Sequence, residues 1–239
     1  MSIAEPPMPT KPQHSIDTMG AMTNEPGLNL WKKQLGSAPD WIWQQTELKT
    51  LVLADNGLTE ISPQIGRLKQ LRMLDLGHNA LANIPDSIGD LEQLTSFLYL
   101  HDNRLATLPE SLSRLNKLRY LNLSQNAFTQ WPEPICAMEG LCELRITDNQ
   151  IREIPPSITR LTRLRELHLR NNLLTSLPEA IGDLTELRSI DLRGNPLQSL
   201  PNTIPALPRL EKLDLRWVTT LQAPEWIAAL ESRGCLIYW

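Results

Sequence analysis

The sequence contains few cysteines. Only three occur among 239 residues, namely Cys136, Cys142 and Cys235. Their number is odd and their spacing matches no metal-ligand pattern, which argues against a disulfide framework or a zinc finger. Because disulfides persist mainly in oxidising compartments, we expect this chain to work with reduced thiols, in the cytoplasm.

An excess of positive charge and long apolar runs are also missing. The chain has 23 Lys and Arg residues against 27 Asp and Glu residues, and its net charge at pH 7 is −4. Nucleic-acid-binding proteins usually present a basic surface, so no nucleic-acid partner is expected. No segment approaches the roughly 20 apolar residues that a membrane-spanning helix needs, so no membrane span is expected. The first residues lack the basic head and the apolar core of a secretory signal peptide.

Residues 1–27 differ in composition from the rest of the chain. Prolines lie there among small and polar residues, and no apolar residue recurs at a regular interval. Such a segment buries too little apolar surface to fold, so we predict a disordered Pro-rich tail. Two overlapping Pro-x-x-Pro spacings, Pro6 to Pro9 and Pro9 to Pro12, would suit a polyproline-recognition groove, although such spacings also arise by chance. The composition is also compatible with an export signal for a bacterial injection apparatus.

Catalytic and phosphate-binding motifs are absent from the sequence. His101, Asp102 and Asn103 stand side by side in LYLHDNRLATLP and are residue types found in hydrolase sites. However, versions of this segment recur along the chain with other residues in place of His101 and Asp102, which indicates repeat positions without a catalytic role. No Gly-rich phosphate loop or metal motif is present, and no Ser or Cys has a repeated acid–base arrangement around it. We therefore expect no enzymatic activity, no cofactor and no metal.

Related segments of about 23 residues fill the chain after the tail. An asparagine marks the same position in each, and all but one of the intervals between these asparagines is 23 residues: Asn56, Asn79, Asn103, Asn126, Asn149, Asn172 and Asn195. A proline recurs with the same step, from Pro85 to Pro224. A fixed period of this size indicates a solenoid, in which each repeat forms one supersecondary unit.

These segments resemble the leucine-rich repeat family. The motif L-x-x-L-x-L-x-x-N-x-L-x-x-L-P-x-x-I-x-x-L covers the chain from about Leu28 to its end. The L-P-x-x-I part is similar to that of the Ras-group repeats of plants and animals and of many small bacterial proteins. The resemblance implies an α/β solenoid shaped as a horseshoe, with a concave parallel β-sheet and short helical or 3-10 convex segments. It also implies protein recognition as the usual activity.

The alternation of side chains within one repeat predicts which of them are buried. In LRMLDLGHN, Leu71, Leu74 and Leu76 are expected in the core, while Met73 and Asp75 face outward. The asparagine that follows is expected to bond the backbone of neighbouring turns through its side-chain amide, and so to form a ladder. One repeat alone cannot bury its leucines, so several must stack.

The two ends of the solenoid are expected to be caps. Residues 28–47 would form the N-terminal cap, residues 48–218 the repeats and residues 219–239 the C-terminal cap. We expect the chain to end in the closing strand, without a second domain. The tryptophans of the terminal units are expected to cover the ends of the core rather than to form an aromatic ligand cage: Trp31, Trp41, Trp43, Trp226 and Trp239.

The outward positions of the expected sheet divide into two zones. The front zone is nearly uncharged with Tyr99 and Tyr120 at its centre, and the rear zone contains a column of arginines flanked by acids. The arginine column is either a self-neutralised charge lattice or a platform for carboxylates or phosphates of a partner. Ten side chains are the candidates for partner binding: Tyr99, His101, Tyr120, Asn122, Arg145, His168, Arg170, Arg193, Arg216 and Trp217.

One repeat contains a surplus residue. The interval from Asn79 to Asn103 is 24 residues, and we expect Phe97 or Leu98 to be the extra one, with Ser96 at the outward position before Tyr99. An extra residue in a strand makes a bulge, which re-aims side chains. A neutral insertion that the fold tolerates is the alternative.

Together these features favour a non-catalytic, monomeric module that binds a protein partner on its concave face. One alternative is a bacterial effector-type repeat protein that is translocated into a host cell. The other is the substrate-recognition arm of a separate catalytic chain, such as a ubiquitin ligase.

Overall fold

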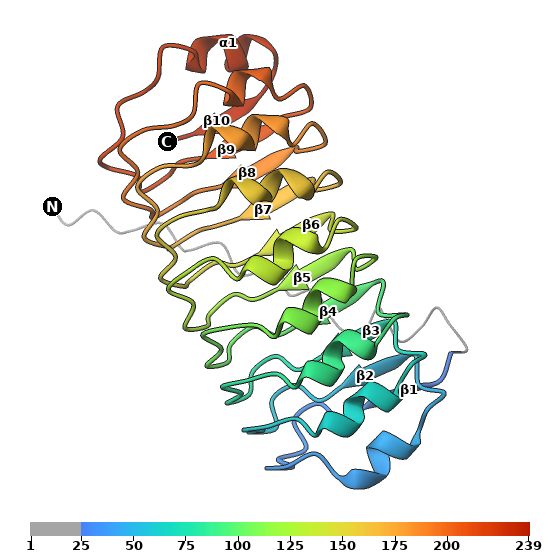
Figure 1. Cartoon of the computed structure of the whole chain (residues 1–239). Coiled ribbons are helices and arrows are strands. Elements are labelled where there is room, and N and C mark those ends of the chain that lie inside the picture. Colours follow the sequence, from blue (N-terminus) through green and yellow to red (C-terminus); the bar gives the residue numbers. More distant parts are fainter. Residues whose placement is uncertain (1–24) are drawn as a thin grey trace, which may run out of the picture.

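Ten parallel strands lie side by side in chain order in the computed structural model, which describes residues 25–239 (Figure 1). The predicted α/β solenoid with one open parallel sheet is therefore confirmed. The register repeats from strand to strand, so that Leu51, Leu74 and Leu98 are aligned. The strands are β1 (Gly27–Asn29), β2 (Thr50–Val52), β3 (Met73–Asp75), β4 (Phe97–Tyr99), β5 (Tyr120–Asn122), β6 (Glu143–Arg145), β7 (Glu166–His168), β8 (Ser189–Asp191), β9 (Lys212–Asp214) and β10 (Leu236–Tyr238).

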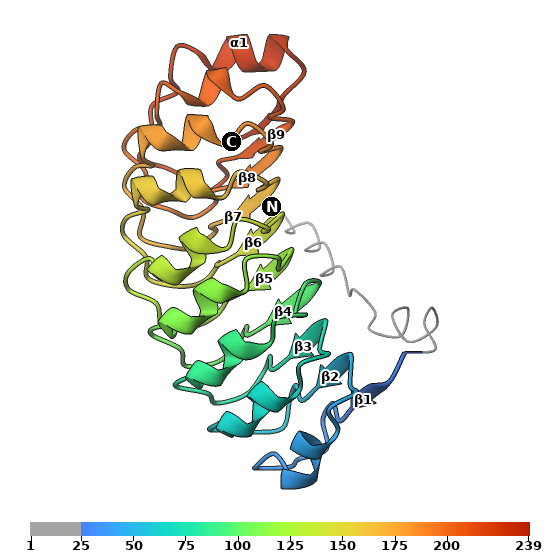
Figure 2. The same cartoon turned by 45° about the vertical axis from the view of Figure 1, so that its right-hand side comes forward.

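Short 3-10 helices cover one face of the sheet, on the convex side of the solenoid (Figure 2). They are η2 (Asp40–Gln44), η3 (Pro63–Arg67), η4 (Asp86–Asp90), η5 (Glu110–Arg114), η6 (Glu133–Ala137), η7 (Pro156–Arg160), η8 (Glu179–Asp183) and η9 (Ile204–Ala206), followed by the α-helix α1 (Ile227–Ser232). A proline in extended conformation precedes most of them, as Pro85 and Pro178 do. Its fixed φ and missing N–H suit a helix start. The isoleucine two residues into the helix, such as Ile88, is fully buried.

The core runs without interruption through the repeats. Leu71, Leu74 and Leu76 are completely buried, and the corresponding positions of the other repeats are as well. Because each leucine layer is closed only by the layers before and after it, the apolar surface of a repeat is removed from water by stacking.

The predicted asparagine ladder is present. The Asn126 amide donates to the carbonyls of Leu100 and Leu123, both at 3.0 Å, and its oxygen accepts from the Leu105 amide at 2.9 Å. The residue before each ladder asparagine has a positive φ of 51–56° in six repeats. Short or flexible polar side chains tolerate this left-handed conformation better than β-branched ones do. These residues are Asp55, His78, Asp102, Gln125, Asp148 and Asn171.

The expected position of the surplus residue was wrong. Met73 pairs with Phe97, and Leu74 pairs with Leu98, so both Phe97 and Leu98 occupy regular strand positions. The extra residue lies before β4, where Thr95 and Ser96 together fill the place of one residue. The amides of Arg119 and Tyr120 accordingly donate to two different carbonyls, those of Thr95 and Ser96. In the next repeat, the two equivalent amides, those of Cys142 and Glu143, donate to a single carbonyl, that of Arg119. Because Leu98 must reach the core, the chain absorbs the insertion ahead of the strand.

The terminal tryptophans cover the ends of the core only in part. Trp43 is fully buried and the partly buried Trp226 packs against the core, as predicted, but Trp31, Trp41 and Trp239 are about half exposed and do not cover the core. At the front, Gly27 of the expected tail already pairs with Thr50 in the sheet, and Glu25 forms ion pairs with Lys49 and Arg72; residues 1–24 of the expected tail lie outside the described residues. No helix in the described part of the chain has the length and hydropathy needed to cross a bilayer.

Candidate functional site

The open face of the sheet carries the candidate residues. The first and third residues of each strand point away from the buried leucines, and the parallel register aligns them in columns across the sheet. The structure places the ten predicted side chains in three groups along these columns. Tyr99, His101, Tyr120 and Asn122 lie together, Arg145, His168 and Arg170 follow, and Arg193, Arg216 and Trp217 lie toward the C-terminal end.

The first group is built around three aromatic rings in mutual contact, of which Phe97 and Tyr99 are stacked and Tyr120 is tilted against both. The ring centroids of Tyr99 and Tyr120 are 5.1 Å apart, and that of Phe97 lies 5.5 Å from Tyr120 and 6.0 Å from Tyr99. We call Phe97, Tyr99 and Tyr120 the aromatic cluster. All three residues are half-buried, because each ring covers part of its neighbours. The cluster is thus a preformed apolar surface with two hydroxyl groups.

The environment of the two hydroxyls keeps them protonated. Burial raises the pKa of Tyr99 to about 12, with a further contribution from the carboxylate of Asp75. Burial also raises the pKa of Tyr120. Asp75 itself is 7% exposed and accepts a hydrogen bond from the Gly77 amide, and burial raises the pKa of its carboxyl group. At neutral pH the tyrosines can therefore donate hydrogen bonds to a ligand.

Phe97 was missed as a member of this site. Counting forward from Leu94 placed Ser96 at its position, because the surplus residue was assigned to the strand. Leu98, Tyr99 and Leu100 alternate between core and open-face positions, as residues of a strand do. Counting back from Leu98 would therefore have placed Phe97 on the open face.

Two histidines and an aspartate form a chain next to the aromatic cluster. His78 Nδ1 lies 2.6 Å from Asp102 Oδ2, and its Nε2 lies 3.2 Å from Nε2 of His101. The His101 ring packs over Gly77, where an added Cβ would come within 2.4 Å of the ring. Burial, followed by repulsion from His78, lowers the pKa of His101 to about 4, so this ring is neutral at pH 7.

The second group is a compact ion-pair network. Arg145 Nε lies 2.5 Å from Glu143 Oε1, and His168 Nε2 lies 3.2 Å from Glu166 and 3.7 Å from Glu143. Arg170 pairs with Asp148 at 3.0 Å. Glu143, Glu166 and His168 are close enough together to ligate one divalent cation. However, the Arg145 guanidinium already pairs with Glu143, and His168 lies beside both carboxylates, so the group is held together by its own side chains.

The arginine column is neutralised by its own aspartates. Arg193 reaches Asp191 through two nitrogens, at 2.5 and 2.8 Å, and Arg216 reaches the fully buried Asp214 in the same way, at 2.8 and 2.9 Å. Burial would raise the pKa of Asp214, but the bond from Arg216 and the charges of Arg193 and Arg216 lower it overall. The geometry therefore agrees with the self-neutralised lattice. Trp217, 64% exposed, lies beside this column, with the Arg193 guanidinium 5.8 Å from its ring centroid.

The comparisons with known proteins agree with this geometry. Two family models described as leucine rich repeat match residues 46–105, 139–197 and 117–138. No curated protein matches the chain.

Solved structures of repeat proteins superpose on most of the chain. A leucine-rich repeat protein of Leptospira interrogans is 27% identical, with a TM-score of 0.70 over 90% of this chain and 67% of its own. The plant peptide hormone receptor RGFR1, solved with RGF2, is 32% identical, with a TM-score of 0.72 over 90% of this chain and 35% of its own.

A third structure is the ectodomain of the Arabidopsis thaliana receptor kinase GASSHO1/SCHENGEN3 in complex with Casparian strip integrity factor 2. It is 33% identical, with a TM-score of 0.69 over 82% of this chain and 24% of its own. The chain thus spans only about a quarter to a third of the two plant receptor structures. Repeats of this kind are typical of protein-interaction modules that are generally not catalytic. By its family models and its fold, the chain belongs to the leucine-rich repeat family.

Proposed function

We propose that this protein is a non-catalytic interaction module that binds a protein partner on its concave face. The observation that carries the proposal is the aromatic cluster, because its rings are already packed against one another and lie on a rigid sheet. Aromatic side chains that are fixed before binding bury much area and lose little rotamer freedom, which makes them favourable anchors. Two solved neighbours, the plant receptors, were determined in complex with their ligands, Casparian strip integrity factor 2 and RGF2, which supports the same use here.

The histidine chain does not favour catalysis. His78 and His101 contact each other and Asp102, but the hydrogen bonds within residues 25–239 connect neither histidine to a serine or a cysteine. A hydrolase of the Ser-His-Asp type needs a nucleophile within hydrogen-bond reach of the base. The proposal therefore assigns His101 to the edge of the binding surface.

The proposed setting is the cytoplasm, with the chain as a monomer. Cys136, Cys142 and Cys235 are all free thiols, and two of them are buried. A reporter protein fused to residues 1–27 would distinguish the cytoplasmic setting from the effector alternative, because only an effector signal would carry the reporter into a host cell. Co-purification of a catalytic subunit from native lysate would support the recognition-arm alternative.

The test of the binding surface uses two tyrosines at the same strand position. Tyr99 is the third residue of β4 and Tyr238 the third residue of β10, six strands or roughly 29 Å away. Once affinity capture with the full chain and mass spectrometry have given a partner, titration calorimetry would compare Tyr99→Ala with Tyr238→Ala. We expect Tyr99→Ala to weaken binding by at least about 2 kcal/mol, or roughly thirtyfold. Unchanged affinity in Tyr99→Ala, or an equal loss in both variants, would refute the proposed surface.

A further inference from the structure

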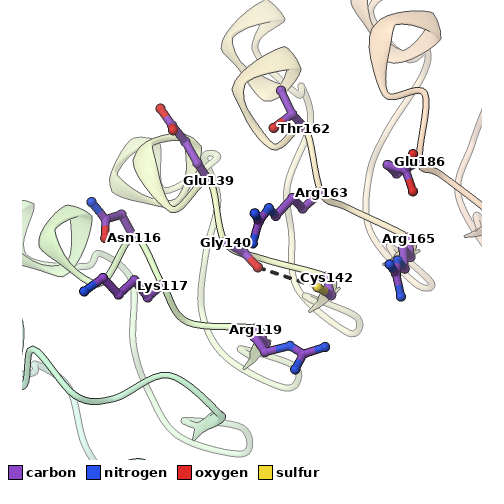
Figure 3. Close-up of a pocket in the computed structure, with 10 residues that line it drawn as sticks. All are labelled: Asn116, Lys117, Arg119, Glu139, Gly140, Cys142, Thr162, Arg163, Arg165 and Glu186. Carbon is purple, nitrogen blue, oxygen red and sulfur yellow. Dashed lines mark hydrogen bonds between the residues drawn. The ribbon is translucent and has the colours of Figure 1, made fainter.

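A basic hollow lies on the flank of the solenoid, where the chain returns from the convex helices to the strands (Figure 3). It has a volume of about 790 Å³ and is lined by the segments that precede β5, β6, β7 and β8. None of its residues belongs to the predicted binding site. Arg163 is one of its lining residues.

The floor of the hollow is made by two small residues of one repeat. Gly140 and Cys142 occupy positions that hold Lys117 and Arg119 in the repeat before, and Arg163 and Arg165 in the repeat after. The Cys142 amide donates to the Arg119 carbonyl, and the Arg165 amide donates to the Cys142 carbonyl, each at 2.8 Å. With strands about 4.8 Å apart, the backbones that carry the flanking cations are roughly 10 Å apart across the small residues. Four cationic side chains, two in each flanking repeat, therefore lie on the two sides of these small residues.

Close packing requires the glycine at this floor. A Cβ on Gly140 would lie 2.6 Å from the carbonyl oxygen of Asn116 and 2.8 Å from the carbonyl carbon of Lys117. Both contacts are with backbone, which cannot move aside cheaply. A side chain at this position is thus excluded by the fold, and the space above it stays open.

The four cations lack ion-pair partners in the described part of the chain, unlike their neighbours. In the following repeats, Arg188 pairs with Glu211 at 3.1 Å, and Arg209 pairs with Glu186 at 2.5 Å. No carboxylate of residues 25–239 lies within 4.0 Å of the charged nitrogens of Lys117, Arg119, Arg163 or Arg165. Two acids also line the hollow: Glu139, and Glu186, whose carboxylate is already paired with Arg209. The chain as a whole has a net charge of −4, so this concentration of positive charge is local.

The basic hollow is continuous with the aromatic cluster. A smaller hollow of about 360 Å³ shares Arg119 and Cys142 with it and is also lined by Phe97 and Tyr120. The surplus residue of the irregular repeat lies at this junction, because Ser96 lines the smaller hollow and its carbonyl accepts from Tyr120. A single extended segment can therefore contact both the rings and the cations.

We propose that the basic hollow binds a segment rich in carboxylates, and that the protein partner carries this acidic segment beside the residue that contacts the aromatic cluster. The attachment to one partner rests on the function proposed above, whereas the affinity of the hollow for carboxylates does not. Guanidinium groups bind carboxylates through two parallel hydrogen bonds, and two arginines on either side of Cys142 offer two such contacts. The uncompensated charge also favours a partner of opposite sign by steering its approach.

The experiment uses the full chain and a rhodamine-labelled hexaglutamate peptide, with hexaglutamine as the neutral probe. Fluorescence anisotropy would compare the wild type with the double variant Arg119→Gln/Arg165→Gln. The matched control is Arg104→Gln/Arg152→Gln, which removes the same charge from two exposed arginines that lie outside the hollow. A second variant, Lys117→Gln/Arg163→Gln, tests the other pair of cations, and circular dichroism would verify that each variant is folded.

We expect hexaglutamate to bind the wild type and hexaglutamine not to bind. The affinity should fall at least about tenfold in both hollow variants and less than about twofold in the control. Absence of hexaglutamate binding, or equal losses in the hollow and control variants, would overturn the proposal. Binding of inorganic phosphate or of a hexanucleotide at equal affinity would overturn the assignment to an acidic protein segment. If hexaglutamate binds as expected but Tyr99→Ala leaves partner affinity unchanged, the basic hollow stands and the proposed concave surface fails.

Discussion

Removal of one ladder asparagine gives a quantitative test of the fold. In the native protein the Asn149 amide donates to the carbonyls of Leu123 and Thr147, at 3.1 and 3.0 Å, and its oxygen accepts from the Phe128 amide at 3.1 Å. Asn149 is 8% exposed, so water cannot replace these bonds fully. In Asn149→Ala the Phe128 N–H is left buried without an acceptor. An orphaned buried group of this kind costs about 1–3 kcal/mol, and we expect the free energy of unfolding to fall by that amount.

Urea unfolding followed by circular dichroism would measure this loss. The control is Gln150→Ala at the next position, which is exposed and should change stability by less than about 0.5 kcal/mol. Asn126→Ala, with the same bonding pattern one repeat earlier, should behave like Asn149→Ala. Unchanged unfolding midpoints in both asparagine variants would show that the ladder contributes nothing to stability, and the reasoning from orphaned backbone groups would be refuted.

Three further predictions concern other parts of the chain. Limited proteolysis with a nonspecific protease should leave a resistant fragment that begins near Leu28, as mass spectrometry would show; a first cut inside the repeats would contradict the predicted tail. Arg193→Glu should lower the melting temperature clearly more than Arg104→Glu, because it places a third carboxylate against Asp191 and Asp214; equal melting temperatures would refute the self-neutralised lattice. His101 should titrate near pH 4 by NMR, and because the unfolded histidine takes up its proton near pH 6.5, stability should decline as the pH falls from 6.5 toward 4; a His101 pKa near 6.5 would contradict its burial.

Periodicity was sufficient to predict most of the fold. Every repeat needs a leucine or isoleucine at the position of Leu74 to fill its layer of the core, and an asparagine at the position of Asn126 to bond the backbone of its turn. One pattern therefore describes the repeats. The self-neutralised lattice was also within reach, because Asp191 and Arg193 lie two residues apart on the same face of a strand.

The exceptions arise where a residue departs from the average repeat. Spacing counted forward from Leu94 made Phe97 or Leu98 the surplus residue, whereas spacing counted back from Leu98 puts Phe97 on the open face. The register with β3 agrees with the second count. The basic hollow was missed for a related reason, because it is created by the small size of Gly140 and Cys142 relative to their neighbours in adjacent repeats. A repeat pattern indicates which side chains are buried and which are exposed, but the volume that small side chains leave open follows only from the packed structure.

The strictly sequential stacking of the strands has a consequence for how the two zones of the open face can change. Within residues 25–239, strands and helices contact only their immediate predecessors and successors along the solenoid. Free energies of distant, unconnected sites are close to additive in such a chain. The aromatic cluster on β4 and β5 is therefore thermodynamically independent of the Arg193 and Arg216 region on β8 and β9. A substitution that retunes partner preference at one end leaves the affinity contributed by the other intact, so the surface behaves as a linear array whose recognition elements can be exchanged one repeat at a time.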